Sequence, residues 1–342
     1  MKAIVKTKRE PGVEVQDRVV PEVTDTDILV KVKAASVCGS DVHVFEWTPS
    51  YEFMPLPVIL GHEFAGEVVS IGSKIKTVAV GDRITAMPGM SCSRCAYCQV
   101  GRPDLCRNRI SMGLAGDGVF AEYIKLTANA TTFKLPATLS FEAASLTEPL
   151  SVVLRAVDLA MLRVGQTAAV LGPGPIGLLT TQIVKLSGVS LLMVAGAAPD
   201  TKRLAVAIEL GADLTIDVTK EDPVKKASSL TRRGFDVVLE ASGSPRSVSQ
   251  AVAMVKPGGK VILIGIHPAP GEIPTTEVVR QSKSIIGAYG YDADIWNRAI
   301  TLLNSKKVKV DPMITHRLPL TEATHGFELL MKKEATKVIF IP

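Results

Sequence analysis

The stretch TAAVLGPGPIG, residues 167–177, decides the fold of this 342-residue chain. An apolar run leads directly into the spacing G-x-G-x-x-G, and an apolar helical pattern, LLTTQIVKLSG, follows it. This context predicts a strand, a phosphate-binding turn and a helix whose first N–H groups face a pyrophosphate. The residues expected at this turn are Gly172, Gly174, Pro175, Ile176 and Gly177. A glycine-rich turn that binds no ligand is the alternative.

Five more short apolar runs follow, at 191–196, 214–218, 235–243, 260–266 and 284–290. Continuous apolar runs of this length suit parallel strands that are buried on both faces. Segments between them, such as DTKRLAVAIELGAD (200–213), have the pattern of amphipathic helices. Residues 151–290 are therefore predicted to form an α/β domain, a doubly wound parallel sheet of the Rossmann type.

The position that usually decides between NAD and NADP lacks its carboxylate. An acidic residue that binds the ribose 2′-hydroxyl is expected about 20 positions after the glycine motif, and that position is Gly196. Asp200 lies one turn further on, and Lys202 and Arg203 follow it. These two cations are candidates for binding a 2′-phosphate, so NADP is slightly favoured over NAD as the cofactor. Arg203 as an ordinary solvated helix residue is the alternative.

Residues 1–150 have a different texture, with β-like runs at 29–37 and 62–72 between turn signals. The last strand-like run, KVIFI (337–341), belongs to a tail from about residue 291 that is expected to return to this first domain.

Hydrophobic residues make up 46% and charged residues 21% of the chain, which is typical of a globular protein. The net charge of +5 comes without basic–aromatic clusters, so nucleic acid is not an expected partner. No signal-peptide or membrane-length apolar run is visible, and a cytoplasmic protein is expected.

Four of the five cysteines lie in SCSRCAYCQVGRPDLC, residues 91–106. In a reducing compartment, clustered cysteines are more often metal ligands than disulfides. The spacing of Cys92, Cys95, Cys98 and Cys106 predicts a closed tetrahedral zinc shell that orders a loop and has no open position for a substrate. An iron–sulfur cluster is the alternative.

A second set of possible ligands is dispersed along the chain and consists of Cys38, His62, Glu63 and Glu148. Each residue alone is weak evidence, because a lone cysteine is usually a small buried hydrophobe. Together they offer sulfur, nitrogen and oxygen donors, and a catalytic zinc has three protein ligands and one open position.

At this point the chain resembles the zinc-containing medium-chain dehydrogenases, a superfamily that includes alcohol, polyol and threonine dehydrogenases. The resemblance rests on CGSDVH (38–43), GHE (61–63), the four-cysteine lobe, EPL (148–150) and the glycine motif, and it extends over the whole chain. It implies a mostly β, GroES-like catalytic domain of residues 1–150 and 291–342, with a zinc-binding lobe near 88–110.

The resemblance also assigns roles to single residues. Cys38 and His62 match the first two ligands of the catalytic zinc, and Glu63 matches the carboxylate that binds zinc directly or alternates with water. Ser40 and His43 match the hydroxyl and imidazole of the proton relay. Glu148 stands where polyol and threonine dehydrogenases have their third ligand, whereas ethanol-type enzymes have a cysteine there. Two zinc ions per chain, one catalytic and one structural, are therefore expected.

The implied activity is a zinc-dependent NAD(P) dehydrogenase that acts on CH–OH donors, oxidising a polyol or another secondary alcohol to a ketone. L-threonine 3-dehydrogenase is the alternative, because CGSDVHVFEW (38–47) resembles the threonine pattern while EPLSVVLRAV (148–157) resembles the sorbitol pattern. An inactive nucleotide-binding or redox-sensing protein would be expected to lack a ligand or relay residue, and none is missing. The expected partners are a small alcohol and further copies of the chain, in a dimer or tetramer paired near 284–290.

Overall fold

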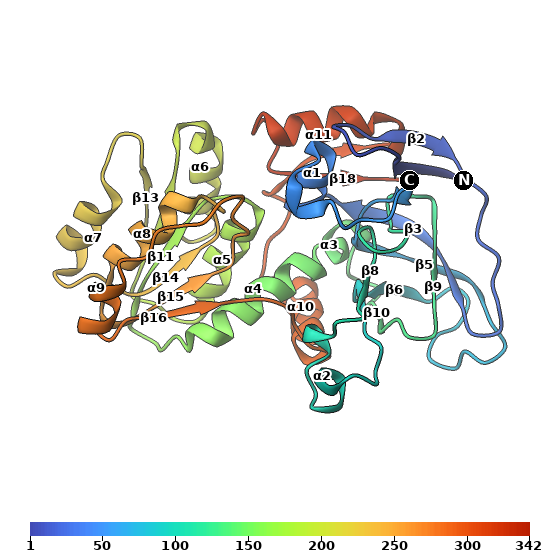
Figure 1. Ribbon diagram of the computed structural model, residues 1–342, viewed down its shortest axis with the longest axis horizontal. Coiled ribbons are helices and arrows are strands. Elements are labelled where there is room, and N and C mark those ends of the chain that lie inside the picture. Colours follow the sequence, from blue (N-terminus) through green and yellow to red (C-terminus); the bar gives the residue numbers. More distant parts are fainter. The chain divides into compact units, whose positions relative to one another are not determined.

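The computed structural model describes all residues, 1–342, and the chain forms two compact units (Figure 1). The first unit contains Met1–Glu148 and Asp292–Pro342, and the second contains Pro149–Tyr291. Helix α4 (Thr147–Ala160) carries the chain from the first unit into the second. None of the helices is both long enough and apolar enough to span a bilayer.

The second unit is built on a six-stranded parallel sheet in the order β13-β12-β11-β14-β15-β16. This confirms the predicted doubly wound α/β fold. The strands are β11 (Thr167–Leu171), β12 (Leu191–Gly196), β13 (Leu214–Asp217), β14 (Phe235–Glu240), β15 (Val255–Leu263) and β16 (Ser284–Gly287). The helices between them are α5 (Pro175–Leu186), α6 (Thr201–Glu209), α7 (Pro223–Thr231), α8 (Pro245–Met254) and α9 (Thr275–Arg280).

Several strand limits differ from the sequence prediction, and β14, β15 and β16 end at 240, 263 and 287 instead of 243, 266 and 290. Strand β15 begins at Val255 rather than 260, because Val255 already pairs with Phe235 of β14; residues 256–259 then form an irregularity before the pairing resumes with Lys260 opposite Val237. Strand β14 ends at Glu240 rather than 243, because the chain bends away at Gly243, whose φ is +69°. The carboxyl end of β14 is therefore a short loop that leads into α8.

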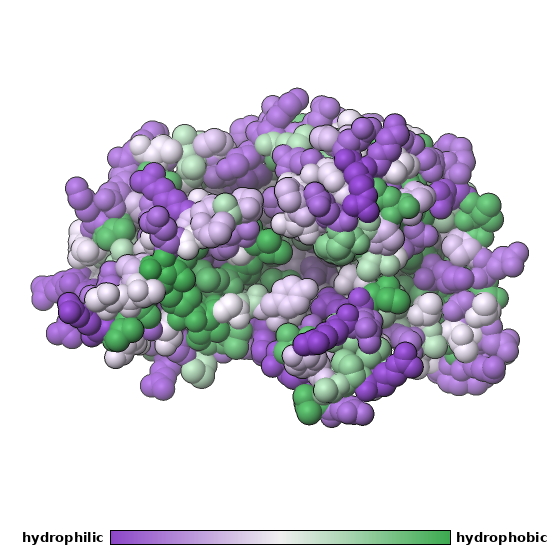
Figure 2. All heavy atoms as spheres, in the orientation of Figure 1, coloured by the Kyte–Doolittle hydropathy of each residue, from purple (hydrophilic) through white to green (hydrophobic).

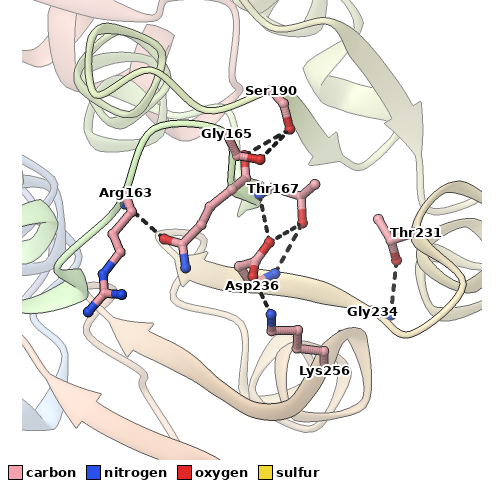
Figure 3. Close-up of polar contacts among 9 residues, drawn as sticks. Arg163, Gly165, Thr167, Ser190, Thr231, Gly234, Asp236 and Lys256 are labelled. Carbon is pink, nitrogen blue, oxygen red and sulfur yellow. Dashed lines mark hydrogen bonds and ion pairs between the residues drawn. The ribbon is translucent and has the colours of Figure 1, made fainter.

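Side chains tie together the amino ends of three neighbouring strands in the second unit (Figure 3). Asp236 Oδ2 accepts hydrogen bonds from the backbone N–H and the hydroxyl of Thr167, both at 2.8 Å. Its other oxygen lies 2.5 Å from the Lys256 ammonium. Burial opposes the charge on Asp236, but the bonds from Lys256 and Thr167 outweigh it and lower the pKa of this carboxyl. The amino edge of the sheet is closed by these contacts, and ligands of such sheets bind at the opposite, carboxyl edge.

The first unit is mostly β. Its largest sheet has the order β10-β6-β5-β3-β18-β17, with β9 paired to β3, and a smaller sheet has the order β2-β1-β4. The strands are β1 (Lys2–Lys6), β2 (Glu14–Asp17), β3 (Ile28–Ser36), β4 (Val58–Ile59), β5 (Glu63–Ile71), β6 (Arg83–Ala86), β7 (Gly89–Met90), β8 (Ile110–Ser111), β9 (Tyr123–Leu126), β10 (Thr132–Lys134), β17 (Ile314–Leu318) and β18 (Lys337–Phe340). The helices are α1 (Gly39–Glu46), α2 (Ala96–Gln99), α3 (Phe141–Ser145), α10 (Ala293–Asn304) and α11 (Ala323–Met331).

The carboxyl-terminal tail completes the sheet of the first unit. Strand β18 runs antiparallel to β3, with Ile339 opposite Ser36. Buried aromatic rings anchor this return: Phe340 packs edge-on against Phe120 at 5.2 Å between centroids, and Phe327 stacks on Phe45 at 4.8 Å. Burying such rings is a large hydrophobic gain, so residues at the very end of the chain are held firmly beside the strand that leads to α1.

Candidate metal centres and nucleotide loop

Strand register brings the dispersed ligands together. Ser36, the last residue of β3, stands opposite Glu63, the first residue of β5. Cys38 lies two residues beyond the end of β3, and His62 immediately precedes β5. Because the strands are antiparallel, both residues emerge at the same end of the sheet. The ligand atoms of Cys38, His62 and Glu63 all lie within 4.8 Å of one another.

Neighbouring residues fix the orientation of Cys38 and His62. Gly61 has a φ of +89°, and a Cβ at this position would lie 2.4 Å from the ring of Phe120, so only glycine allows this approach into His62. Asp41 is fully buried in the first turn of α1 and accepts a hydrogen bond of 2.9 Å from the Cys38 N–H. Its other oxygen lies 3.6 Å from His62 Nδ1. With Nδ1 facing a carboxylate, Nε2 is the ring nitrogen left for a metal, which is the usual arrangement around zinc.

The electrostatic field at His62 is negative. Burial disfavours its charged form, but Asp41 and Cys38 outweigh that effect and raise the pKa of His62 well above its usual value. A thiol, an imidazole and a carboxylate in such a field are suited to a divalent cation of intermediate softness, and zinc is the common choice for mixed sulfur, nitrogen and oxygen ligands.

Glu63 offers only one of its two oxygens to a ligand. Oε2 accepts hydrogen bonds from the Ser36 hydroxyl and from the Lys337 ammonium, the latter at 2.6 Å. Lys337 also donates to the Val37 carbonyl at 2.8 Å. The side chains of Lys337 and Glu63 are 2% and 0% exposed, so this ion pair is hidden from solvent. Oε1 of Glu63 is buried and has no hydrogen-bond partner, which fits an atom reserved for a metal ion.

The other predicted residues of this site lie on two helices. Ser40 and His43 are three residues apart in α1, so they share one side of that helix. The Ser40 hydroxyl is buried without a hydrogen-bond partner, whereas the His43 side chain is 37% exposed and lies 3.8 Å from Glu46. Glu148 is half-buried in the first turn of α4, and it is not among the ligand atoms that lie within 4.8 Å of one another.

Sequence reasoning missed three residues that shape this site: Ser36, Asp41 and Lys337. Asp41 had a local signal, because it is three residues after Cys38 at the start of a helix, where an acidic side chain caps the backbone. Ser36 and Lys337 had none. Lys337 is 274 residues from Glu63 in sequence, and only the return of β18 to β3 brings them together.

The four-cysteine lobe projects from the first unit as a loop on the short β7–β8 pair, with α2 at its tip (Figure 1). The four Sγ atoms lie within 4.8 Å of one another. Cys95 and Cys98 are 3.5 Å apart, as are Cys92 and Cys106. A tetrahedral site with zinc–sulfur bonds of about 2.3 Å has sulfur atoms about 3.8 Å apart, so the arrangement fits zinc. Disulfides are excluded, because every cysteine in the chain is free.

Backbone N–H groups favour thiolate in this lobe. Hydrogen bonds from the N–H groups of Arg94 and Cys95 lower the pKa of Cys92 to about 6. The pKa of Cys95 is also lowered, chiefly by the N–H of Cys98, whereas burial raises that of Cys98 to about 11. Thiolate is the form that binds metal, so the backbone favours the metal-binding form at Cys92 and Cys95.

The glycine motif forms the turn between β11 and α5, as the spacing predicts. Gly172 has a φ of +97°, and a Cβ there would lie 2.6 Å from the Ser242 backbone. A Cβ on Gly177 would lie 1.7 Å from the Gly172 carbonyl, so the helix packs against the turn only without a side chain. A Cβ on Gly174 would meet nothing within 4 Å, so this face is open. Pro175 and Ile176 begin α5. The open backbone at a helix N-terminus fits the pyrophosphate of a dinucleotide.

At the end of β12, Gly196 brings no carboxylate to the ribose position. Asp200 is buried and lies 3.1 Å from the guanidinium of Arg203, which is also buried. Burial lowers the pKa of Arg203, and Asp200 opposes this shift. Arg203 is therefore not a solvated helix residue, and its charge is already matched by Asp200. Lys202 is exposed and is the cation that remains available for a phosphate.

Comparison with known proteins gives a consistent result. The family described as alcohol dehydrogenase GroES-like domain matches residues 24–137, and the family described as zinc-binding dehydrogenase matches residues 175–305. L-threonine 3-dehydrogenase of Bacillus licheniformis is 36% identical over 100% of this chain and 99% of its own. A candidate zinc-binding dehydrogenase of Sinorhizobium meliloti, solved with NADP, has a TM-score of 0.91 at 33% identity, covering 100% of this chain and 99% of its own. The 2R,3R-butanediol dehydrogenase of Bacillus subtilis has a TM-score of 0.90 at 31% identity over the same shares.

The two ligand sets predict two independent metal ions. Elemental analysis is expected to give about two zinc ions per chain. Cys38→Ala should keep the ion of the lobe, since none of the lobe's four ligands is changed, and should lose turnover. Cys95→Ala should lose the ion of the lobe and lower thermal stability or solubility. Loss of both ions in Cys38→Ala, or full turnover in a folded Cys38→Ala protein, would contradict the assignment.

The Lys337–Glu63 pair predicts a difference between metal-free and zinc-loaded protein. Lys337→Met leaves Glu63 as a buried carboxylate without its cation, which typically costs about 3–5 kcal/mol. Zinc can offset part of that charge, so urea unfolding should show a larger loss of stability in chelator-treated protein than in loaded protein. Lys337→Arg, which keeps the positive charge, is the matched control. An equal loss in both states would show that Lys337 acts only through packing.

Proposed function

The chain belongs to the zinc-containing medium-chain dehydrogenases, and we propose that it oxidises a secondary alcohol to a ketone with NADP⁺ or NAD⁺ as the hydride acceptor. The observation that supports this most directly is the set formed by Cys38, His62 and Glu63, three different donor types within 4.8 Å of one another. Beside it, the Ser40 hydroxyl is buried without a partner, where a substrate hydroxyl would need one.

Cys38, His62 and Glu63 would hold the catalytic zinc, and Glu148, half-buried in α4, would supply a further carboxylate on binding. When bound, zinc lowers the pKa of an alcohol hydroxyl and the nicotinamide accepts a hydride from its carbon. The chain itself supplies orientation. Asp41 fixes His62, and Lys337 with Ser36 restrains Glu63 so that a single oxygen, Oε1, faces the metal position. A shell of few protein ligands leaves a position for the substrate.

Two side chains of α1, Ser40 and His43, carry away the proton of the substrate hydroxyl. Ser40 accepts it from the substrate and passes its own hydroxyl proton on towards His43, one helical turn away, which releases a proton to solvent in turn. The burial of the Ser40 hydroxyl and the 37% exposure of His43 suit these two steps. Imidazole is the side chain best able to exchange protons near neutral pH.

NADP is the preferred cofactor in this proposal. The end of β12 carries Gly196 instead of a carboxylate, so nothing there repels a 2′-phosphate. Lys202, exposed at the start of α6, can bind it, whereas Arg203 is engaged with Asp200. The relative from Sinorhizobium meliloti that was solved with NADP is consistent with this preference.

Two substrate classes remain, and both contain a secondary alcohol. The butanediol dehydrogenase at a TM-score of 0.90 supports a diol or polyol. The name of the full-length Bacillus licheniformis relative, at 36% identity, supports L-threonine as the second candidate. The two classes differ in charge, because threonine carries an ammonium and a carboxylate near the reacting carbon and a polyol carries neither.

A panel of polyols, diols, simple secondary alcohols and L-threonine, each with NADP⁺ and NAD⁺, tests the proposal through the ultraviolet absorbance of the reduced nicotinamide. Turnover of at least one secondary alcohol is expected, with a higher kcat/KM for NADP⁺. Lys202→Ala should lower kcat/KM for NADP⁺ roughly tenfold, as expected for the loss of one charge-assisted hydrogen bond, and leave NAD⁺ unchanged. Lys220→Ala, another exposed lysine of this unit, is the control. No turnover with any alcohol would sink the proposal.

We also infer that the chain assembles through the edge strand β16, which has a neighbour on one side only. Figure 2 shows apolar side chains gathered over the region of the second unit where Figure 1 places β15 and β16. Ile285 and Ile286 in β16 are half-buried, and Tyr289 just beyond is 66% exposed. An unprotected apolar edge strand is a template for pairing with another chain, and a second copy would pair antiparallel to it.

Light scattering after size exclusion is expected to give a dimer or a multiple of it for the wild-type protein. Ile285→Lys places a charge on the edge and should shift the population towards monomer. Val19→Lys, which changes an exposed apolar residue of the first unit, should leave the mass unchanged. A monomeric wild type, or an unaltered mass for Ile285→Lys, would argue against pairing at β16.

A further inference from the structure

A buried carboxylate outside the metal site ends strand β14. Glu240 is 0% exposed, and its Oε1 accepts three hydrogen bonds: from the Ser242 N–H at 2.7 Å, the Ser242 hydroxyl at 2.5 Å and the Ser247 hydroxyl at 2.7 Å. Its Oε2 accepts none, but it lies 3.0 Å from Nε2 of His267. The two atoms are close without being aligned for a hydrogen bond, and both are buried.

His267 is the side chain that forms an ion-pair contact with Glu240. The other groups against the pair are uncharged: the serines 242 and 247, the backbone of Gly243, and Gly265, where a Cβ would lie 2.6 Å from Oε2. Arg246 in the first turn of α8 and Glu272 in the loop before α9 are exposed and form no ion pair with either residue. A buried carboxylate is costly unless it is paired, and the His267 imidazole is the side chain placed to pair with Glu240.

The pair lies on the carboxyl edge of the sheet. Glu240 is the last residue of β14, and His267 follows β15 by four residues. Ser242, which binds Glu240, also touches the glycine turn, because a Cβ on Gly172 would lie 2.6 Å from its Cα. In a doubly wound sheet, the dinucleotide crosses the carboxyl ends, with one mononucleotide half on each side of the first strand. The order β13-β12-β11-β14-β15-β16 places the pair on the half opposite Gly196, which is the nicotinamide half.

From this position we propose that Glu240 and His267 form a proton-binding pair that couples the charge of the nucleotide-binding unit to the oxidation state of the bound nicotinamide. The oxidised ring carries one positive charge, which it loses when it accepts a hydride. A protonated His267 is therefore disfavoured beside the oxidised ring and favoured beside the reduced ring, so the unit takes up a proton from solvent as the ring is reduced. The inference rests on NAD(P) binding as proposed above, but not on the identity of the alcohol.

The proposal requires histidine and carboxylate together. Glu240 is the partner that a protonated imidazole would have in this buried position, and imidazole is the only common side chain whose charge changes near neutral pH. A lysine or arginine at 267 would stay charged, and an asparagine would stay neutral. Two charges about 10 Å apart in a protein at an effective dielectric constant of about 20 change each other's equilibria roughly tenfold.

The test measures the dissociation constants of oxidised and reduced cofactor with the zinc-loaded full-length protein, from about pH 5.5 to about pH 9. Cofactor fluorescence and calorimetry give the constants, and calorimetry in buffers of different ionisation enthalpy counts the protons taken up. The readout is the dissociation constant of the oxidised cofactor divided by that of the reduced cofactor. Groups that both forms of the cofactor share, such as the phosphates, affect both constants equally, so their titration cancels in this ratio.

In the wild type, the ratio of the oxidised to the reduced dissociation constant is expected to rise roughly tenfold as the pH falls across the measured range. His267→Asn should remove most of that rise, and His267→Gln provides a second variant should the first fold poorly. His316→Asn, at a half-buried histidine of β17 in the first unit, is the matched control and should behave as wild type. The same rise in His267→Asn or His267→Gln as in wild type would overturn the inference while leaving dinucleotide binding intact. No binding of either cofactor form would overturn both the inference and the proposed function.

Discussion

The register between β3 and β5 is the constraint on which the metal site depends. It places Ser36 opposite Glu63, and thereby Cys38 beside His62. Gly66 helps to lock it, because a Cβ there would lie 2.4 Å from the Lys31 carbonyl on β3. A slip of one residue would turn each side chain of β5 to the other face of the sheet. The site is thus specified by backbone pairing along two nine-residue strands rather than by the ligands themselves.

The buried acidic side chains around Cys38 and His62 need a positive charge nearby. Asp41 and Glu63 are buried acids beside the Cys38 thiol, and Lys337 is the one cation bonded to Glu63. A buried ion pair adds little net stability, because desolvation offsets the attraction between its members. Lys337 is better understood as a means of positioning: it holds one oxygen of Glu63 and leaves the other oriented for a metal. The stability of the unit and the geometry of its site are therefore coupled through one carboxylate.

The fold of the second unit can be predicted from the sequence much more fully than the geometry of the candidate metal site. Apolar runs and the glycine motif are local signals, so six strands and the turn at Gly172 could be predicted in order. The start of β15 could not, because Pro-Gly-Gly ordinarily ends a strand. The donor types of Cys38, His62 and Glu63 suggest a shared metal site, but only the family resemblance assigns their roles in it, since Cys38 is distant from His62 and Glu63 in sequence. The ion pair of Arg203 with Asp200 depends on the burial of both side chains. The ion pair of Lys337 with Glu63 joins residues that are 274 positions apart in the sequence. Such contacts are set by tertiary packing and leave no local pattern.

Both units place a buried carboxylate at the end of a strand, but with different partners. Glu63 is bonded to a lysine, and Glu240 lies beside a histidine. Lysine keeps its charge across neutral pH, whereas histidine can lose or gain a proton there. A fixed cation suits a site that must hold one geometry for a metal of constant charge. A side chain that can gain or lose its positive charge suits a site whose ligand changes charge during the reaction. The two partners thus differ in the way expected if the charge beside Glu63 stays constant and the charge near Glu240 changes, as proposed above.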